Sequence, residues 1–206
     1  MDLEGLLSDS LLWRGSGGHF GNTAAIATGF SELDHYLPGG GWPLTGISEI
    51  FIERYGLGEL SILMPALAAL SSRAAETRRW IVWVAPPFVP YAPALAHHGV
   101  DLSRILLVHP GEEALWAVEQ VIRSKSSLAV LAWVRAADMP SLRRLQLGAE
   151  ACRCWTVLFR PVSAIDQSSP AALRFRLSSA TSADPQLGIH IQIQKCRGRK
   201  PRHFLL

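Results

Sequence analysis

The turn after the first apolar strand of the chain, Ile47–Ile52, is where phosphate-binding residues would be expected. An open parallel α/β sheet binds its ligands at the carboxyl ends of its strands. A phosphate-binding loop of the form GxxxxGK[ST] wraps the phosphates with backbone N–H groups, neutralises their charge with a lysine and holds Mg²⁺ with a hydroxyl. Such a loop would support binding and cleavage of a nucleoside triphosphate.

The loop after this strand carries different groups: Glu53, Gly56, Gly58, Glu59 and Leu60. With Gly58 taken as the second glycine of the motif, Glu53 stands at the first glycine position. Glu59 then holds the lysine position and Leu60 the hydroxyl position. A carboxylate about 4 Å from a phosphate charge costs roughly 4 kcal/mol at an effective dielectric near 20, where a lysine would contribute about as much. We therefore predict no nucleotide cofactor and no ATPase activity.

Two further strand ends lack the carboxylates that ATP hydrolysis needs. The strand over residues 128–134 ends in Trp133 and Val134 instead of the aspartate of a Walker-B strand, and Asp138 lies beyond it, where it would cap the next helix. The strand over residues 80–85 runs into two prolines and offers no carboxylate at its tip. We predict no catalytic residue.

Composition and cysteine spacing exclude several other classes of protein. The three cysteines include no CxxC pair and no histidine at zinc-ligand spacing, so we expect reduced thiols and no metal. The N-terminus lacks the cationic start of a signal peptide, and no uncharged apolar run reaches the ~20 residues of a membrane span. We therefore expect a cytoplasmic protein without a membrane partner.

The elements that position these loops alternate between strand and helix. The expected strands cover residues 47–52, 80–85, 105–108, 128–134 and 155–159, and the expected helices 60–78, 92–98, 112–125 and 141–153. This alternation predicts an α/β fold with a mostly parallel central sheet and right-handed crossovers. Two late segments, 173–177 and 189–194, are expected to add antiparallel strands at one sheet edge.

Both ends of the chain differ from this core, which we place at residues 29–194. Residues 1–28 form an arm in which leucines recur at helical spacing before a glycine joint, and residues 195–206 form a basic tail without acids. The tail has three interpretations: a solvated end, a protein-docking segment, or a contact to a DNA backbone with steep salt dependence. Its apolar terminus favours docking. The residues expected to bind partners are Leu7, Leu11, Trp13, Lys195, Arg197, Arg199, Lys200, Arg202, Phe204, Leu205 and Leu206.

One glycine-rich stretch carries a resemblance to a known family. Residues 28–34, 38–43 and 47–50 are similar to the approach of RecA to its phosphate loop, and residues 99–106 and 171–175 also resemble RecA. The ATGF…LD…LPGGGWP pattern, with Trp13 and Arg14, resembles the ImuA family. The resemblance implies a RecA-like three-layer core in an accessory protein of SOS-induced, error-prone translesion DNA synthesis. It implies as partners an ImuB-like polymerase-related protein, a DnaE-type polymerase assembly and RecA, with the arm available for self-association.

A second resemblance gives an alternative function. Residues 47–50, 79–84 and 159–163 are similar to SulA, which implies a cell division inhibitor that binds FtsZ. Chains of the SulA type are shorter and lack the glycine-rich stretch and the late strands. Residues 28–46 and 171–206 therefore favour the ImuA family.

Overall fold

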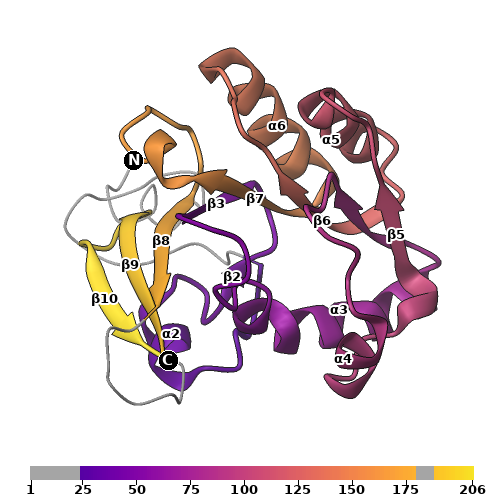
Figure 1. The fold of residues 1–206 in the computed structure, drawn as a ribbon, viewed down its shortest axis with the longest axis horizontal. Coiled ribbons are helices and arrows are strands. Elements are labelled where there is room, and N and C mark those ends of the chain that lie inside the picture. The colour runs from indigo at the N-terminus through magenta and orange to yellow at the C-terminus, as the bar shows by residue number, and fades with distance from the viewer. Residues whose placement is uncertain (1–23, 180–187) are drawn as a thin grey trace, which may run out of the picture.

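The computed structural model describes residues 24–179 and 188–206, which form a three-layer α/β fold (Figure 1). Its main sheet has the strand order β10-β9-β8-β3-β7-β6-β4-β5. The parallel strands are β3 (Ile47–Ile52), β4 (Trp80–Val84), β5 (Ile105–Val108), β6 (Ser127–Trp133), β7 (Trp155–Pro161) and β8 (Leu173–Ser179). The predicted α/β class with a mostly parallel sheet is confirmed.

Helices cover both faces of this sheet. The helical elements are α2 (Ser31–Tyr36), η1 (Ser61–Leu63), α3 (Met64–Thr77), α4 (Ala92–His97), η2 (Leu102–Arg104), α5 (Ala114–Arg123), α6 (Met139–Cys152) and η3 (Val162–Ala164). Buried side chains of α2, α3 and α4 share one core cluster with Ile50 and Phe175, and those of α5 and α6 share a second with Ile47 and Val82. Figure 1 shows α5 and α6 on one side of the sheet and α2, α3 and α4 on the other.

Local sequence signals explain where several helices begin and end. The Asp138 side chain accepts a hydrogen bond from Ser141 N at 3.1 Å, as predicted for a helix cap, and a proline follows in the first turn of α6. The helix α4 ends before Gly99, whose φ of 81° is readily adopted only by glycine. No helix in the described ranges is long and apolar enough to cross a bilayer.

The C-terminal part differs from the sequence-based expectation in one respect. Strand β8 pairs in parallel with β3 on one side and antiparallel with β9 (Ile189–Cys196) on the other, and β9 pairs antiparallel with the edge strand β10 (Arg202–Leu205). The expected antiparallel pairing at this edge is confirmed for β8 with β9 and for β9 with β10, whereas the pairing of β8 with β3 is parallel. The connection from β7 passes through η3 and over β3, so β8 enters the sheet in the same direction as its neighbour.

The described chain begins with a short second ribbon that belongs to the core. Strand β1 (Ala25–Ile26), in the expected arm, pairs with β2 (Trp42–Pro43). Trp42 is buried and stacks on Phe175 and Trp155, with ring centroids 5.7 and 6.4 Å apart. A Cβ atom on Gly41 would clash with the backbone carbonyl of Ile26, so this glycine allows β1 to approach β2 closely.

Candidate functional site

The loop after β3 occupies the position at which a RecA-type fold would hold phosphate. Its Glu59 side chain is only 6% exposed, and Oε1 accepts a hydrogen bond from the backbone N–H of Gly56 at 3.1 Å. The carboxyl group at the lysine position thus binds a backbone donor of the loop itself. Glu53, at the first glycine position, accepts instead from the Arg176 guanidinium on β8. Both carboxyl groups have protein partners.

The two glycines of this loop have structural roles. Gly56 and Gly58 have φ values of 82° and 88°, in the left-handed region that favours glycine. A Cβ atom on Gly58 would also lie 2.9 Å from Cδ1 of Ile189, so the loop packs closely against the start of β9. Leu60, at the expected hydroxyl position, packs against the core cluster on the α3 face.

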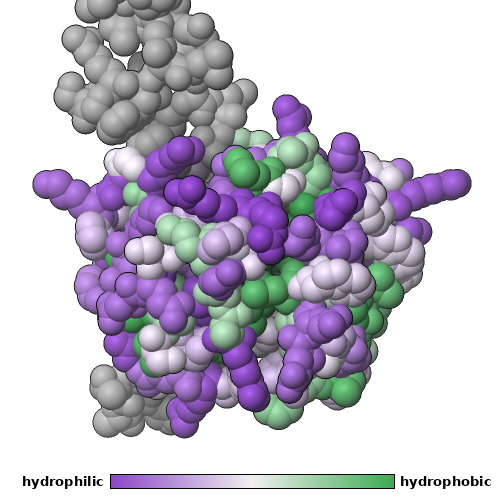
Figure 2. All heavy atoms as spheres, turned by 90° about the horizontal axis from the view of Figure 1, so that it is seen from above, coloured by the Kyte–Doolittle hydropathy of each residue, from purple (hydrophilic) through white to green (hydrophobic). Residues whose placement is uncertain are grey.

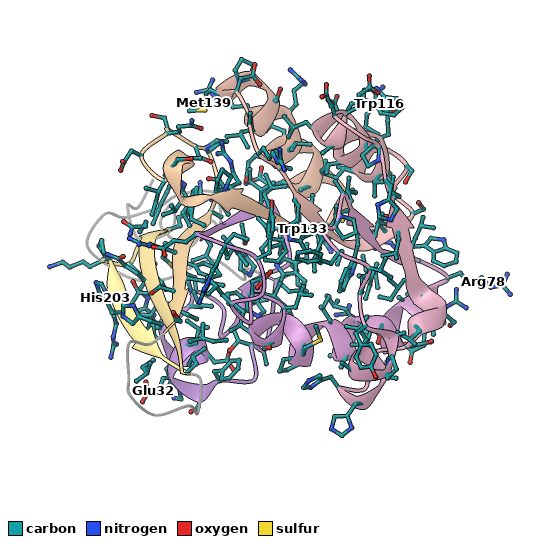
Figure 3. The ribbon with its side chains drawn as sticks, in the orientation of Figure 1. Glu32, Arg78, Trp116, Trp133, Met139 and His203 are labelled. Carbon is teal, nitrogen blue, oxygen red and sulfur yellow. The ribbon has the colours of Figure 1, made fainter. Side chains whose placement is uncertain are left out.

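An apolar cavity of about 250 Å³ adjoins the loop at the carboxyl ends of the strands. Its lining residues are Gly56, Gly58, Glu59, Leu60, Trp83, Pro86, Pro87, Phe88, Val89, Pro90, Tyr91 and Trp133. The ring of Trp133 lies 5.8 Å from that of Trp83 and stacks on Phe159 at 4.7 Å. Figure 3 shows Trp133 in the interior, whereas Trp116 and Met139 lie at the periphery. Indole rings and prolines therefore occupy the strand ends at which an ATPase would carry its carboxylates.

The C-terminal basic residues lie on a β-hairpin packed against the core, which differs from the expected tail. This basic hairpin comprises the exposed residues Lys195, Arg197, Arg199, Lys200 and Arg202 on β9, β10 and their connection. The Tyr36 hydroxyl donates to the Lys200 carbonyl, and the Arg202 guanidinium lies 5.8 Å from the Tyr36 ring. Among described residues, no carboxylate pairs with Lys195, Arg197, Lys200 or Arg202.

The three apolar residues at the end of this segment have different environments. Phe204 is buried and meets Tyr36 edge-on at 5.2 Å, so it belongs to the core instead of a docking surface. Leu205 is exposed, and Leu206 is half-buried, with its backbone paired to Ile189. The expected arm residues Leu7, Leu11 and Trp13 lie outside the described residues. The basic residues and Leu205 therefore remain as the accessible part of the expected site.

Sequence reasoning missed a buried ionic network beside the site. Glu49 of β3 bonds Arg160 of β7 and Arg174 of β8, each at 2.7 Å, and Arg160 also donates to Gln167 at 2.7 Å. Arg174 donates to the carbonyl groups of Ile165 and Gln167. Through these hydrogen bonds the network links the connection between β7 and β8 to the central strand β3. Its signal in the sequence was a charged residue within each of three apolar strands.

The cysteines form no metal-binding site in the described ranges. Figure 2 shows a face on which hydrophilic and hydrophobic side chains are interspersed. The three cysteines are free, and no cluster of histidine, cysteine and acidic side chains suited to a metal ion is found among described residues. The hydrogen bond from the Cys154 thiol lowers the pKa of Cys152 to about 7, and burial raises the pKa of Cys196 to about 11.

Comparison with known proteins gives relatives over most of the chain, although no protein-family model matches it. The chain is 26% identical to Protein ImuA of Caulobacter vibrioides, over 89% of this chain and 83% of that protein. It is 29% identical to the cell division inhibitor SulA of Edwardsiella piscicida, over 54% of this chain and 68% of that protein. It is 33% identical to Protein RecA of Mycoplasma genitalium, over 54% of this chain and 32% of that protein. The chain is thus similar to ImuA over most of its length and to SulA over about half of it.

Proposed function

We propose that this chain is a non-catalytic, RecA-like accessory protein of the SOS response. It acts in the cytoplasm, in error-prone translesion DNA synthesis, by binding an ImuB-like polymerase-related protein and through it a DnaE-type polymerase assembly. RecA is a further partner. The similarity to ImuA over 89% of the chain supports this role.

The observation that carries the non-catalytic assignment is the position of Glu59. Its buried carboxyl group accepts the Gly56 N–H, a donor that a phosphate-binding loop would offer to its ligand. A phosphate at this place would have to displace the carboxyl group and approach a like charge in a poorly solvated site. Neither Leu60 nor Trp133 can hold Mg²⁺, which requires oxygen ligands.

The basic hairpin is the surface we assign to partner binding. Its cations are exposed, and Leu205, an apolar residue on the same hairpin, is 64% exposed. The pKa of Lys195 is lowered, first by burial and then by the nearby Arg174. The five exposed cations of the hairpin give this edge of the sheet a positive surface. A partner with an acidic, partly apolar face would complement it. The same charge allows a weak contact to DNA.

Co-elution of the chain with an ImuB-like protein in size-exclusion chromatography tests this proposal. The test variant reverses two hairpin charges, Arg197→Glu and Lys200→Glu, which lie on exposed side chains. The matched control reverses Arg73 and Arg143, two exposed arginines on α3 and α6. We expect the test variant to bind about tenfold more weakly and the control to bind like the unmodified chain. Equal binding by both variants would show that the basic hairpin is not the partner-binding surface.

A second candidate function is inhibition of cell division through FtsZ. The similarity to a protein named as a cell division inhibitor, over 54% of this chain, favours it. Sedimentation of FtsZ polymers with GTP discriminates between the two functions. Loss of polymer at stoichiometric amounts of the chain would support inhibition, whereas unchanged polymer together with co-elution of an ImuB-like protein would support the accessory role.

A further inference from the structure

Two cysteines lie on either side of the residue that ends helix α6. Cys152 is the last residue of α6, and Cys154 directly precedes β7. Arg153, between them, has φ 50° and ψ 52°, in the left-handed helical region. A residue in a helical conformation of either hand holds the Cα atoms of its two neighbours about 5.4 Å apart. This separation is close to the value of about 5.5–6 Å that is commonest in disulfides, so the helix cap brings the two cysteines within bonding reach.

The two thiols interact with each other and differ in their access to solvent. The hydrogen bond from the Cys154 thiol is the main cause that lowers the pKa of Cys152 to about 7, and the same bond, together with burial, raises the pKa of Cys154. Cys154 is completely buried, whereas Cys152 is only partly buried. A small solute therefore reaches Cys152 first, and Cys154 is placed to react with Cys152 alone.

A cation adjoins this cysteine pair. Nη2 of Arg79 donates to the carbonyl of Ser127 and, at 3.5 Å, to the carbonyl of Cys152. In the part of the chain that the structure describes, no carboxylate forms an ion pair with Arg79. Its charge also contributes to the low pKa of Cys152. Thiolates form and react most readily beside such a cation, so Cys152 has the surroundings of a nucleophilic cysteine.

The pair lies away from the surfaces considered so far. Arg79 precedes β4, Ser127 begins β6 and Cys154 precedes β7, so the cluster lies at the amino ends of three parallel strands. The loop after β3 lies at the carboxyl ends. In the sheet, β3 and β8 separate β7 from the basic hairpin. Neither the absence of phosphate-binding residues nor the charge of the hairpin explains the cysteine pair.

We propose that Cys152 and Cys154 form a peroxide-reactive dithiol, a modification site at which the chain is reversibly oxidised to an intramolecular disulfide. The Cys152 thiolate attacks one oxygen of hydrogen peroxide, so that an S–O bond forms, the O–O bond breaks and the released hydroxide takes up a proton as water. The Cys154 sulfur then attacks the sulfur of the resulting sulfenic acid. The S–S bond forms, the S–O bond breaks, and the Cys154 proton leaves with the hydroxyl group as a second water.

The dithiol supplies the two electrons that reduce the peroxide, and a dithiol reductant restores both thiols by exchange. The inference goes beyond the proposed function, because the reaction needs no partner protein. Its failure would leave partner binding at the basic hairpin untouched.

Trypsin gives a direct readout, because it cleaves after Arg153, between the two cysteines. The reduced chain yields the peptides 145–153 and 154–160 separately. The test treats the folded chain with equimolar hydrogen peroxide, alkylates the remaining thiols under denaturing conditions and digests without reductant. We expect mass spectrometry to find the two peptides joined, with the loss of two hydrogen atoms, and a phosphine reductant to separate them.

Cysteine variants identify the two roles. Cys154→Ser should stop the reaction at the sulfenic acid of Cys152, which dimedone traps. The matched control, Cys196→Ala, should form the link as the unmodified chain does. Oxidation of Cys152 to sulfinic acid without a link, a link from Cys152 to Cys196, or a disulfide-linked dimer of the unmodified chain would overturn the proposal.

Two neighbouring arginines test the role of the cation. Arg79→Met should slow formation of the link at pH 7 about tenfold and move the midpoint of its pH profile upward, because the thiolate loses a neighbouring positive charge. Arg78→Met is the matched control, since Figure 3 shows Arg78 at the periphery and its side chain is exposed. It should change neither the rate nor the midpoint. Equal profiles for the two variants would overturn the role assigned to Arg79.

Discussion

Nη1 of Arg160 lies 2.7 Å from Oε1 of Glu49, and both side chains are completely buried. The other carboxylate oxygen of Glu49 lies 2.7 Å from Nε of Arg174, so one anion is shared by two cations within the sheet. This network joins β3 to the strands on both of its sides, β7 and β8. The network therefore holds together β3, which leads into the loop at the phosphate position, and β8, which pairs with the C-terminal hairpin.

Removal of the central anion should strongly destabilise the fold. Glu49→Gln leaves two buried guanidinium groups close together without a counter-charge, and loss of one partner from a buried ion pair typically costs about 3–5 kcal/mol. Urea denaturation measures the free energy of unfolding. The control is Arg144→Met, which removes an exposed partner of Glu119 and should change stability by less than about 1 kcal/mol. Similar effects of the two substitutions would contradict the assigned role of the network.

The edge strand β10 offers a matched pair of neighbouring apolar residues. Phe204→Ala deletes a buried ring that packs on Tyr36, and such truncations cost about 3–5 kcal/mol. Leu205→Ala removes a side chain that is 64% exposed and should be nearly neutral. Thermal unfolding of both variants tests whether β10 is part of the cooperative fold. Equal melting temperatures would mean that Phe204 does not support the core in solution.

The order of strands and helices along the chain was predictable from the sequence because periodicity and turn residues are local signals. The buried run over β6, the glycine after α4 and the acid at the start of α6 are examples. The direction of β8 was not predictable in this way. It depends on which strand β8 pairs with, and pairing is a long-range property.

The candidate site was predictable only in part for the same reason. The residues of the loop after β3 are contiguous, so the sequence alone shows which side chains it carries. The hydrogen bond from Gly56 to Glu59 is visible only in the folded loop. Composition suggested a solvated or docking tail at residues 195–206. The sequence did not reveal that Tyr36 packs under this segment, because 164 residues separate Tyr36 from its partner Lys200.

Cys152 should be the cysteine that reacts fastest near neutral pH. The hydrogen bond from Cys154 and the nearby Arg79 favour its thiolate and lower its pKa to about 7, whereas burial raises the pKa of Cys196 to about 11. Its rate of alkylation by iodoacetamide should therefore rise through pH 7 and level off above it. Mass spectrometry locates the label, and Cys152→Ser should abolish the fast phase. A midpoint near the ordinary thiol value would contradict the assigned hydrogen bond.

Asp138 should contribute an acid-sensitive part of the stability. Hydrogen bonds from Ser141 lower its pKa, so its stabilising effect is present above the pKa of an unfolded aspartate and disappears as pH falls through the lower folded value. Asp138→Ala should lower the melting temperature at pH 7, with a difference that shrinks in acid. Asp138→Asn, which retains a capping oxygen, should keep most of the stability at pH 7. A pH-independent effect of the alanine variant would contradict this role.

We propose that the RecA-like scaffold binds a protein partner and does so without nucleotide. Calorimetric titration of the chain with an ImuB-like protein, with and without near-millimolar ATP and Mg²⁺, tests both halves of that claim together. We expect saturable binding with the same Kd in both conditions and no saturable heat from ATP alone. Binding that requires ATP, or saturable ATP binding by the chain itself, would contradict it.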